Sequence, residues 1–369
     1  KNEKFEVLSV KNGERRKKPP LPFTTSTLQQ EASKRLNMST QKTMRLAQEL
    51  YEGVTLKGKG SVGLITYLRT DSTRISEEAD ASCREYIAQQ YGEQFVGDKT
   101  AVKSSKTGKI QDAHEAIRPT DSSLSPAMLK EQLPRDLFRL YQLIWTRFLA
   151  SRMAEAVYET TSVKIGAGDY RFNVAASKVK FDGFMTVYSY DSEKSTMNAA
   201  MKKITKDTEI TLSGLDPQQH FTQPPAHFTE ASLVKTLEEL GIGRPSTYSP
   251  TITTLLARRY IVKESKNLYI TELGEVVNNI MKKSFASIVD VNFTAYMEGL
   301  LDRVEDGSVK WKTVVRNFYP DLHEAVEQAQ KELEQVKIED EVTDVICEEC
   351  GRNMVVKYGP HGKFLACPG

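Results

Sequence analysis

The sequence lacks the features that mark membrane-spanning and secreted proteins. No apolar run is long enough to cross a bilayer, and no secretory leader is present. Only 4 of the 369 residues are cysteine, and in an intracellular setting these are not expected to form disulfides. We therefore expect a cytoplasmic protein with no membrane partner.

An excess of charge of one sign is also missing. Lys plus Arg (51) nearly balance Asp plus Glu (49), so the net charge of +2 does not reveal a polyanionic partner. A nucleic-acid surface would have to come from local clusters such as Arg15 to Lys18, a pattern that is equally typical of a solvated loop. The 39% hydrophobic content is that of a globular protein with two or three domains, which we expect to be a monomer.

Local patterns divide the chain into β and helical parts. Residues 1–22 and 157–225 carry alternating or β-branched runs and are predicted to form one β domain. Residues 23–156 show helical periodicity, so this helical domain is predicted to be an insertion in the β domain. A second helical domain is expected over 226–337, and the composition changes again over 341–369. The predicted fold class is multidomain α+β, mainly helical, with hinges near Pro22 and Glu155.

The β domain is predicted from five short runs. The first run is followed by a segment with a glycine and several basic residues, which we expect to form a turn. The runs are Phe5–Val10, Ser162–Ile165, Tyr170–Val174, Met185–Tyr188 and Glu209–Leu212.

The second helical domain has the element order of a winged helix. An amphipathic helix over 230–240 is followed by a Gly-rich turn, and Ser246 is the expected N-cap of a helix running to Arg259. Two runs that fit a hairpin come next, over 260–262 and 267–271. Winged helices commonly bind nucleic acids, although some serve only as interaction modules.

The run Gly63–Thr73, Gly-Leu-Ile-Thr-Tyr-Leu-Arg-Thr-Asp-Ser-Thr, most strongly indicates a catalytic centre. In an extended strand alternate residues share a face, so Tyr67 and Arg69 would point the same way. A guanidinium favours the phenolate form of a neighbouring tyrosine and can hold a phosphate oxygen through two hydrogen bonds. The pair suits attack on a phosphodiester, although tyrosines two residues before an arginine are common in ordinary packing.

The order Ile-Thr-Tyr-Leu-Arg-Thr-Asp-Ser resembles the active-site signature of type IA DNA topoisomerases. Four further blocks resemble the family's other signatures and occur in the family's order. They are Pro22–Gln30, Ala47–Glu52, Ala113–Pro119 and Gly241–Tyr248.

The resemblance implies an enzyme that acts on single-stranded and negatively supercoiled DNA in the nucleoid without ATP. Tyr67 would form an ester with the 5′-phosphate of one strand, Arg69 would bind the scissile phosphate, and His114 would orient it or move a proton. The other DNA-binding positions that the resemblance implies lie around the tyrosine and in the winged helix. They are Gln48, Glu52, Thr66, Thr70, Asp71, Arg244, Ser246, Thr247, Tyr248 and Arg258.

The family's magnesium site has no counterpart in this sequence. Type IA enzymes carry an N-terminal toprim domain with an Asp-x-Asp-x-x-Glu cluster that binds Mg²⁺, whereas these 369 residues contain no Asp-x-Asp. The first residue is Lys1 and not Met, which indicates a piece of a longer chain. We expect such a piece to bind single-stranded DNA but to cleave or reseal it poorly.

The last cysteines resemble the start of a four-cysteine zinc ribbon of the kind found in topoisomerase I tails. Cys347, Cys350 and Cys367 would be three Zn²⁺ ligands, and we expect an incomplete site because a fourth would lie downstream of Gly369. His361 is a possible substitute ligand. Cys83 is expected to be an ordinary thiol.

A second hypothesis belongs to another class of function. The chain would be a non-catalytic module, a winged helix plus zinc ribbon that binds single-stranded DNA and in which the tyrosine motif is inert. A covalent DNA adduct that requires Tyr67 would separate the two hypotheses.

Overall fold

The computed structural model describes residues 3–98, 114–189, 204–333, 341–359 and 362–369. It contains two compact units, residues 1–253 and 254–369. His361 lies outside the described residues. None of the described helices is long and apolar enough to cross a membrane. The four-part domain division proposed above stays a prediction.

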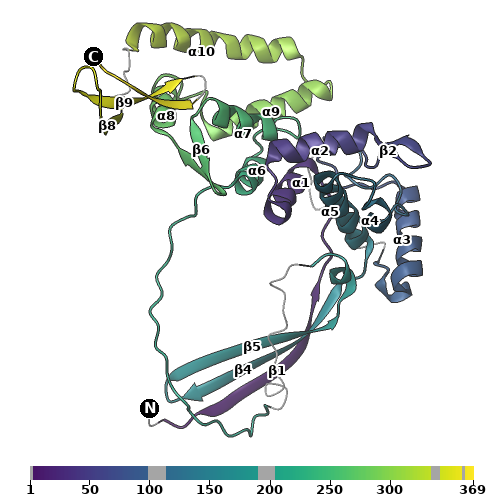
Figure 1. The fold of residues 1–369 in the computed structure, drawn as a ribbon. Helices are drawn as coiled ribbons and strands as arrows, with labels where there is room; N and C mark the ends of the chain where they lie inside the picture. Colours follow the sequence, from purple (N-terminus) through teal and green to yellow (C-terminus); the bar gives the residue numbers. More distant parts are fainter. Residues whose placement is uncertain (1–2, 99–113, 190–203, 334–340, 360–361) are drawn as a thin grey trace. The chain divides into compact units, whose positions relative to one another are not determined.

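The first unit contains a three-stranded antiparallel sheet in the order β1-β4-β5. Its strands are β1 (Glu6–Lys17), β4 (Ala156–Ala167) and β5 (Tyr170–Phe181) (Figure 1). Val10 pairs with Val163, which confirms the predicted pairing of the first strand with the later β segment. The helices between β1 and β4 are therefore inserted between two neighbouring strands.

Three local predictions for the sheet were wrong. The basic segment that was expected to turn continues β1 as far as Lys17, paired with Ala156. Residues Met185–Tyr188 were expected to form a strand, but a 3₁₀ helix, η4 (Gly183–Thr186), stands there and buries Phe184 and Met185 in the hydrophobic core. Glu209–Leu212 forms no strand, because no neighbouring strand pairs with its backbone in the described structure.

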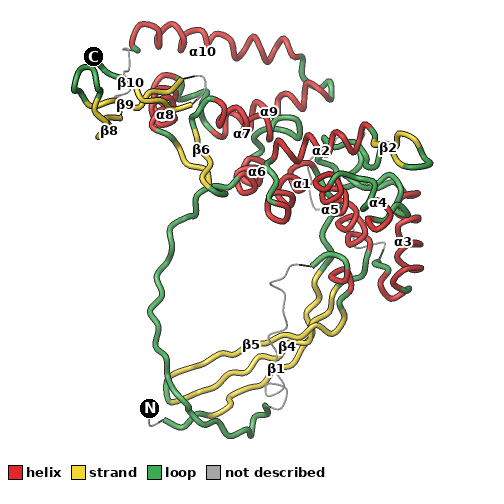
Figure 2. Tube along the Cα trace, in the orientation of Figure 1, coloured by secondary structure: helices red, strands yellow, loops and turns green. Residues whose placement is uncertain are grey.

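The inserted block consists mainly of helices, drawn in red in Figure 2, which pack around one hydrophobic core. Its longest helix buries Tyr141, Ile144 and Phe148. The N-caps Thr24, Ser39 and Ser76 accept backbone hydrogen bonds, as expected for helix starts. The elements are α1 (Thr25–Glu31), the π-helix η1 (Ala32–Leu36), α2 (Thr40–Glu52), β2 (Val54–Leu56), β3 (Gly60–Val62), α3 (Glu77–Tyr91), η2 (Glu93–Phe95), α4 (Pro126–Leu129) and α5 (Arg135–Arg152).

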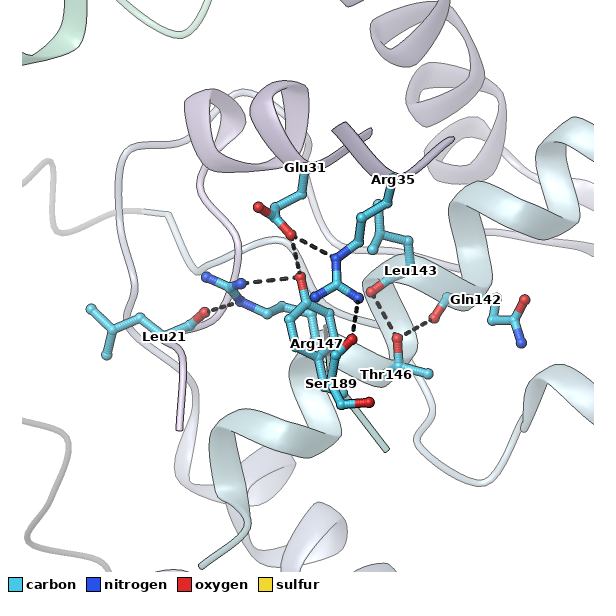
Figure 3. A network of polar contacts seen from close by, with 9 residues as sticks. Leu21, Glu31, Arg35, Gln142, Leu143, Thr146, Arg147 and Ser189 are labelled. Carbon is cyan, nitrogen blue, oxygen red and sulfur yellow. Dashed lines mark hydrogen bonds and ion pairs between the residues drawn. The ribbon is translucent and has the colours of Figure 1, made fainter. Parts of the chain in front are cut away.

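A buried polar network ties the helical block to the segments that leave the sheet (Figure 3). Glu31 accepts hydrogen bonds from Arg35 at 2.8 Å and from the Tyr188 hydroxyl at 2.8 Å. Arg147 donates to the Leu21 carbonyl at 2.6 Å and to the same hydroxyl at 3.2 Å. Leu21 follows β1, next to the predicted hinge at Pro22, and Tyr188 follows β5, so one network ties the segments after these two strands to the helical block.

Helix α6 (Glu230–Glu239) contacts α1 within the first unit. The buried Glu230 carboxylate accepts from the Thr40 backbone N–H at 2.7 Å and from its hydroxyl at 2.9 Å. A carboxylate at the first turn of α2 also interacts favourably with the helix dipole. This contact anchors the start of α6 to the helical block.

The elements after α6 follow the predicted order. Helix α7 (Tyr248–Ala257) is followed by a hairpin of β6 (Ile261–Glu264) and β7 (Asn267–Ile270). Ser246 was expected to cap α7, but it lies in the preceding turn and the helix begins at Tyr248. The second unit continues with α8 (Glu272–Ser284), α9 (Val291–Glu305), α10 (Trp311–Glu332), β8 (Glu341–Ile346), β9 (Asn353–Gly359) and β10 (Gly362–Ala366).

Candidate active site and nucleic-acid interface

The run that carries Tyr67 is a loop and not the strand that was expected. Ile65 makes a single antiparallel bridge with Pro119, and bends follow it. The burial still alternates as in extended backbone, because Leu68 and Thr70 are buried while Tyr67 and Arg69 are exposed. Tyr67 is 36% exposed, so a polymer in solution can reach it.

Hydrogen bonds from distant parts of the sequence fix this loop. The Thr25 hydroxyl, at the start of α1, donates to the Leu68 carbonyl at 2.7 Å. The same hydroxyl accepts a hydrogen bond from the Thr70 N–H at 2.9 Å. The Thr66 N–H donates to the Arg118 carbonyl at 2.9 Å, and the Thr66 hydroxyl donates to the Ala116 carbonyl at 2.7 Å. Three of the signature blocks therefore meet at the loop.

Two aromatic side chains flank the ring of Tyr67. The ring centroid of His114 lies 5.2 Å away at an interplanar angle of 30°, and that of Tyr51 lies 5.5 Å away in an edge-on arrangement. Tyr51 is in the last turn of α2, and Leu64 N–H donates to the Leu50 carbonyl of that helix at 2.7 Å. Gly63 approaches the Tyr51 carbonyl so closely that a Cβ would lie 2.7 Å from its oxygen, which explains a glycine there.

The other predicted residues near Tyr67 differ in what they contact. Gln48 donates to Glu52 at 2.6 Å on α2, and Asp71 is exposed. Thr70 is only 2% exposed and its hydroxyl accepts from the Ser72 N–H at 3.0 Å. The N–H and the hydroxyl of Thr66 both donate to backbone carbonyls, as described above. Thr66 and Thr70 thus hold the loop in place, and their direct contact with DNA has no support in the structure.

The winged-helix positions also fall into two groups. Ser246 and Thr247 are exposed, and Arg258 is exposed at the end of α7. Arg244 is half-buried and donates to the Gly243 carbonyl at 2.8 Å, which shapes the turn before α7. Tyr248 is 7% exposed, so it is a packing residue in the first turn of the helix and its predicted DNA contact has no support.

Three cysteines in the second unit fit a metal ion. The sulfurs of Cys347, Cys350 and Cys367 lie within 4.8 Å of one another, as ligands of one Zn²⁺ would. Backbone hydrogen bonds from Cys350 and Glu349, together with the Cys367 thiol, lower the pKa of Cys347 to about 7, which favours the thiolate that binds metal. Cys83, in contrast, is fully buried and burial raises its pKa to about 12.

Comparisons with known proteins identify the family of the chain. The family model of DNA topoisomerases matches residues 1–316. The solved structure of full-length topoisomerase I from Thermotoga maritima is similar, with a TM-score of 0.73 and 37% sequence identity over 99% of this chain. The chain belongs to the type IA DNA topoisomerase family. It spans 59% of the length of the Thermotoga protein.

In this topoisomerase core, two features near Tyr67 were missed by sequence reasoning. Tyr51 lies within a signature block, but nothing in the block predicts that its ring meets Tyr67. Glu115 and Arg118 form an ion pair of 2.7 Å beside His114. Burial raises the pKa of Glu115, but the hydrogen bond and charge of Arg118 outweigh it and the pKa lies below its ordinary value. Both residues lie in a signature block, but they are not on a helix, so their spacing of three residues does not predict the contact.

Proposed function

We propose that this chain forms the core of an enzyme that cleaves one DNA strand at Tyr67, lets another strand pass, and reseals the break, which relaxes negative supercoils without ATP. The observation that carries the proposal is the exposed phenol of Tyr67 beside the His114 ring, in a loop built by the signature blocks. Membership of the family supports the reaction class.

The reaction exchanges one phosphorus–oxygen bond for another. The Tyr67 oxygen attacks the phosphorus and loses its proton, the bond to the 3′ oxygen breaks, and that oxygen leaves as a hydroxyl after it takes a proton. The DNA 5′-phosphate is then esterified to Tyr67. Resealing is the reverse reaction, and because the ester conserves the bond, no nucleotide is hydrolysed.

Two neighbouring side chains have chemistry suited to these steps. Arg69, exposed two residues after the nucleophile, would neutralise charge on the non-bridging phosphate oxygens, which grows in the transition state. His114, whose ring lies against the Tyr67 ring, would orient the phosphate or transfer a proton. Gln48, Glu52 and Asp71, none of which is buried, would meet the strand near the break.

Family resemblance implies Mg²⁺, but the described residues do not fit a magnesium site. In the described part of the chain, the cysteine cluster is the place where three metal-ligating side chains come close enough to bind one ion. Its ligand atoms are sulfur, which Mg²⁺ does not prefer. We assign no step to the ion. The cysteine cluster fits Zn²⁺, which would stabilise the fold of β8 to β10 when bound.

A trapping experiment tests the proposal. The chain is incubated with a 3′-labelled single-stranded oligonucleotide and Mg²⁺, alone and with the toprim domain of a family member added in trans, and then denatured. We expect a labelled protein band with the added domain, and no band for Tyr67→Phe. Tyr51→Phe is the matched control, since it removes a hydroxyl from the adjacent ring and should retain the band.

The alternative function predicts a different outcome. If the chain is a non-catalytic DNA-binding module, the oligonucleotide binds with an affinity that falls with salt, but no adduct forms in any arm. An equal band for Tyr67→Phe and wild type would also overturn the proposal, because another residue would then be the nucleophile.

A further inference from the structure

Helix α10 in the second unit carries an exposed apolar ridge that the site at Tyr67 does not explain. Trp311, Val315 and Tyr319 follow one another at intervals of four residues, so they form a continuous ridge on the helix surface. Their exposures are 60%, 52% and 58%, whereas Val314, which lies about 100° around the helix axis from Val315, is buried. Large exposed aromatic side chains in such a row are typical of interaction surfaces.

A basic ridge runs beside the aromatic one. Lys312 and Arg316 are exposed and occupy the next row of the helix, and the Lys312 ammonium lies 5.7 Å from the centroid of the Trp311 ring. Residues 310–320 contain three basic and no acidic side chains. Residues 321–332 contain four acidic and one basic side chain, so the net charge is positive only in the half of α10 that carries the aromatics.

The helix dipole adds to the positive charge of these basic side chains. Trp311 and Lys312 lie in the first turn of α10, where N–H groups without intrahelical partners give the helix its positive end. An anion is therefore favoured at the start of the two ridges by the side chains and by the backbone together. A protein partner that bound only through the apolar ridge would not need this charge.

We infer that this half of α10 is a second binding surface for single-stranded DNA, in which bases stack on Trp311 and Tyr319 while Lys312 and Arg316 contact the phosphates. Parallel rows of aromatic and basic side chains match the alternation of bases and phosphates in an unpaired strand. Duplex DNA fits less well, because its bases are already stacked on each other. The inference deepens the proposed function, since it rests on single-stranded DNA as the substrate of the chain.

The two tryptophans of the chain make the surface directly observable. Trp145 is buried and donates to the Ser122 carbonyl, whereas Trp311 is exposed. Stacking of a base quenches the fluorescence of the tryptophan it covers. Titration of the full chain with oligothymidylate should therefore quench tryptophan emission, and Trp311→Phe should remove most of that quench because only Trp145 still emits.

Affinity measurements give the second readout. In fluorescence anisotropy with labelled oligothymidylate, Trp311→Ala with Tyr319→Ala should weaken binding about tenfold or more, because stacking contributes strongly for each base. Lys312→Gln with Arg316→Gln should lower the slope of log affinity against log salt by about 0.7 for each phosphate that the variant no longer neutralises. Tyr170→Ala, at the 72% exposed Tyr170 on β5, is the matched control and should bind as wild type.

The outcomes separate this inference from the proposed function. Unchanged affinity and salt slope in the α10 variants, with no quench of Trp311, would overturn the inference even if Tyr67 forms its adduct. A concentration-dependent dimer in sedimentation that Trp311→Ala abolishes, again without a DNA effect, would also overturn it and assign the ridge to a second copy of the chain. Tyr67→Phe should leave the quench intact.

Discussion

The ring of His114 lies 5.2 Å from the ring of Tyr67, centroid to centroid, although 46 residues separate them in the sequence and a different segment carries each. The two segments are joined by backbone hydrogen bonds, such as that from the Thr66 N–H to the Arg118 carbonyl. The imidazole of His114 is therefore held beside the phenol by the fold of the helical block and not by local sequence.

His114→Ala should slow adduct formation by about 10²-fold, within the usual contribution of a general acid or base. Binding of the oligonucleotide should stay within about twofold of wild type, because the substitution removes no phosphate contact. Adduct formation over time and anisotropy measure the two effects. His220→Ala replaces an exposed histidine and should change neither; loss of binding in proportion to loss of adduct would contradict a role in chemistry.

Tyr188→Phe should destabilise the first unit by about 1–3 kcal/mol, the range for a buried polar group that loses its partner. The change leaves Glu31 without the 2.8 Å hydrogen bond from the hydroxyl, and Arg147 keeps only the Leu21 carbonyl of the two acceptors described above. The melting temperature should fall by about 2–4 °C for each kcal/mol. Tyr170→Phe, at an exposed tyrosine, is the control, and equal melting temperatures for the two variants would contradict the role of the network.

The ion pairs of Asp80 should make the stability of the first unit depend on pH in the acidic range. Its carboxylate pairs with Arg84 at 2.7 Å and Arg152 at 2.9 Å. Burial raises the pKa of Asp80, but the hydrogen bonds and charges of the two arginines outweigh it and hold the pKa below its ordinary value of 3.8. The stabilisation is thus complete above that value and is lost as the pH falls toward the lower folded pKa.

Urea unfolding at pH 7 and at pH 3 measures this effect. Asp80→Asn should have a lower urea midpoint of unfolding than wild type at pH 7. The gap between the two midpoints should narrow at pH 3. Asp169→Asn, at an exposed turn position, should behave as wild type at both values. A gap that stays constant or widens in acid would show that the ion pairs do not produce it.

The thiols should react in a defined order. Without metal, iodoacetamide at pH 7.5 should modify Cys347 first, since its pKa is lowered to about 7, and should leave Cys83 unmodified until the protein unfolds. One equivalent of Zn²⁺ should protect the three clustered cysteines. Mass spectrometry of tryptic peptides gives the order, and protection that survives Cys367→Ser but not Cys83→Ser would contradict the proposed cluster.

Much of the fold follows from local patterns in the sequence. The amphipathic helix over 230–240 and the order of α6, α7 and the hairpin were predicted because each depends on neighbouring residues. The pairing of β1 with β4 also followed, because alternation identified both strands. The wrong strand at Met185–Tyr188 shows the limit: burial of Phe184 and Met185 against the helical core favours a 3₁₀ turn over the local β pattern.

The site was predicted in part for the same reason. The resemblance identified Tyr67 and His114, and the structure brings their rings together. The loop conformation of the run could not be predicted, because its hydrogen-bond partners, Thr25 and Arg118, lie more than 40 residues away. Burial of Thr70 and Tyr248 likewise depends on packing that the motif does not contain.

Mass spectrometry of the trapped adduct tests the central claim most directly. Trypsin should release Tyr67 in the peptide Gly60–Arg69, in which it is the single tyrosine. After nuclease digestion, fragmentation of this peptide should place a residual nucleotide 5′-phosphate on Tyr67. A nucleotide on Ser61, on Thr66 or on any other peptide would contradict the account.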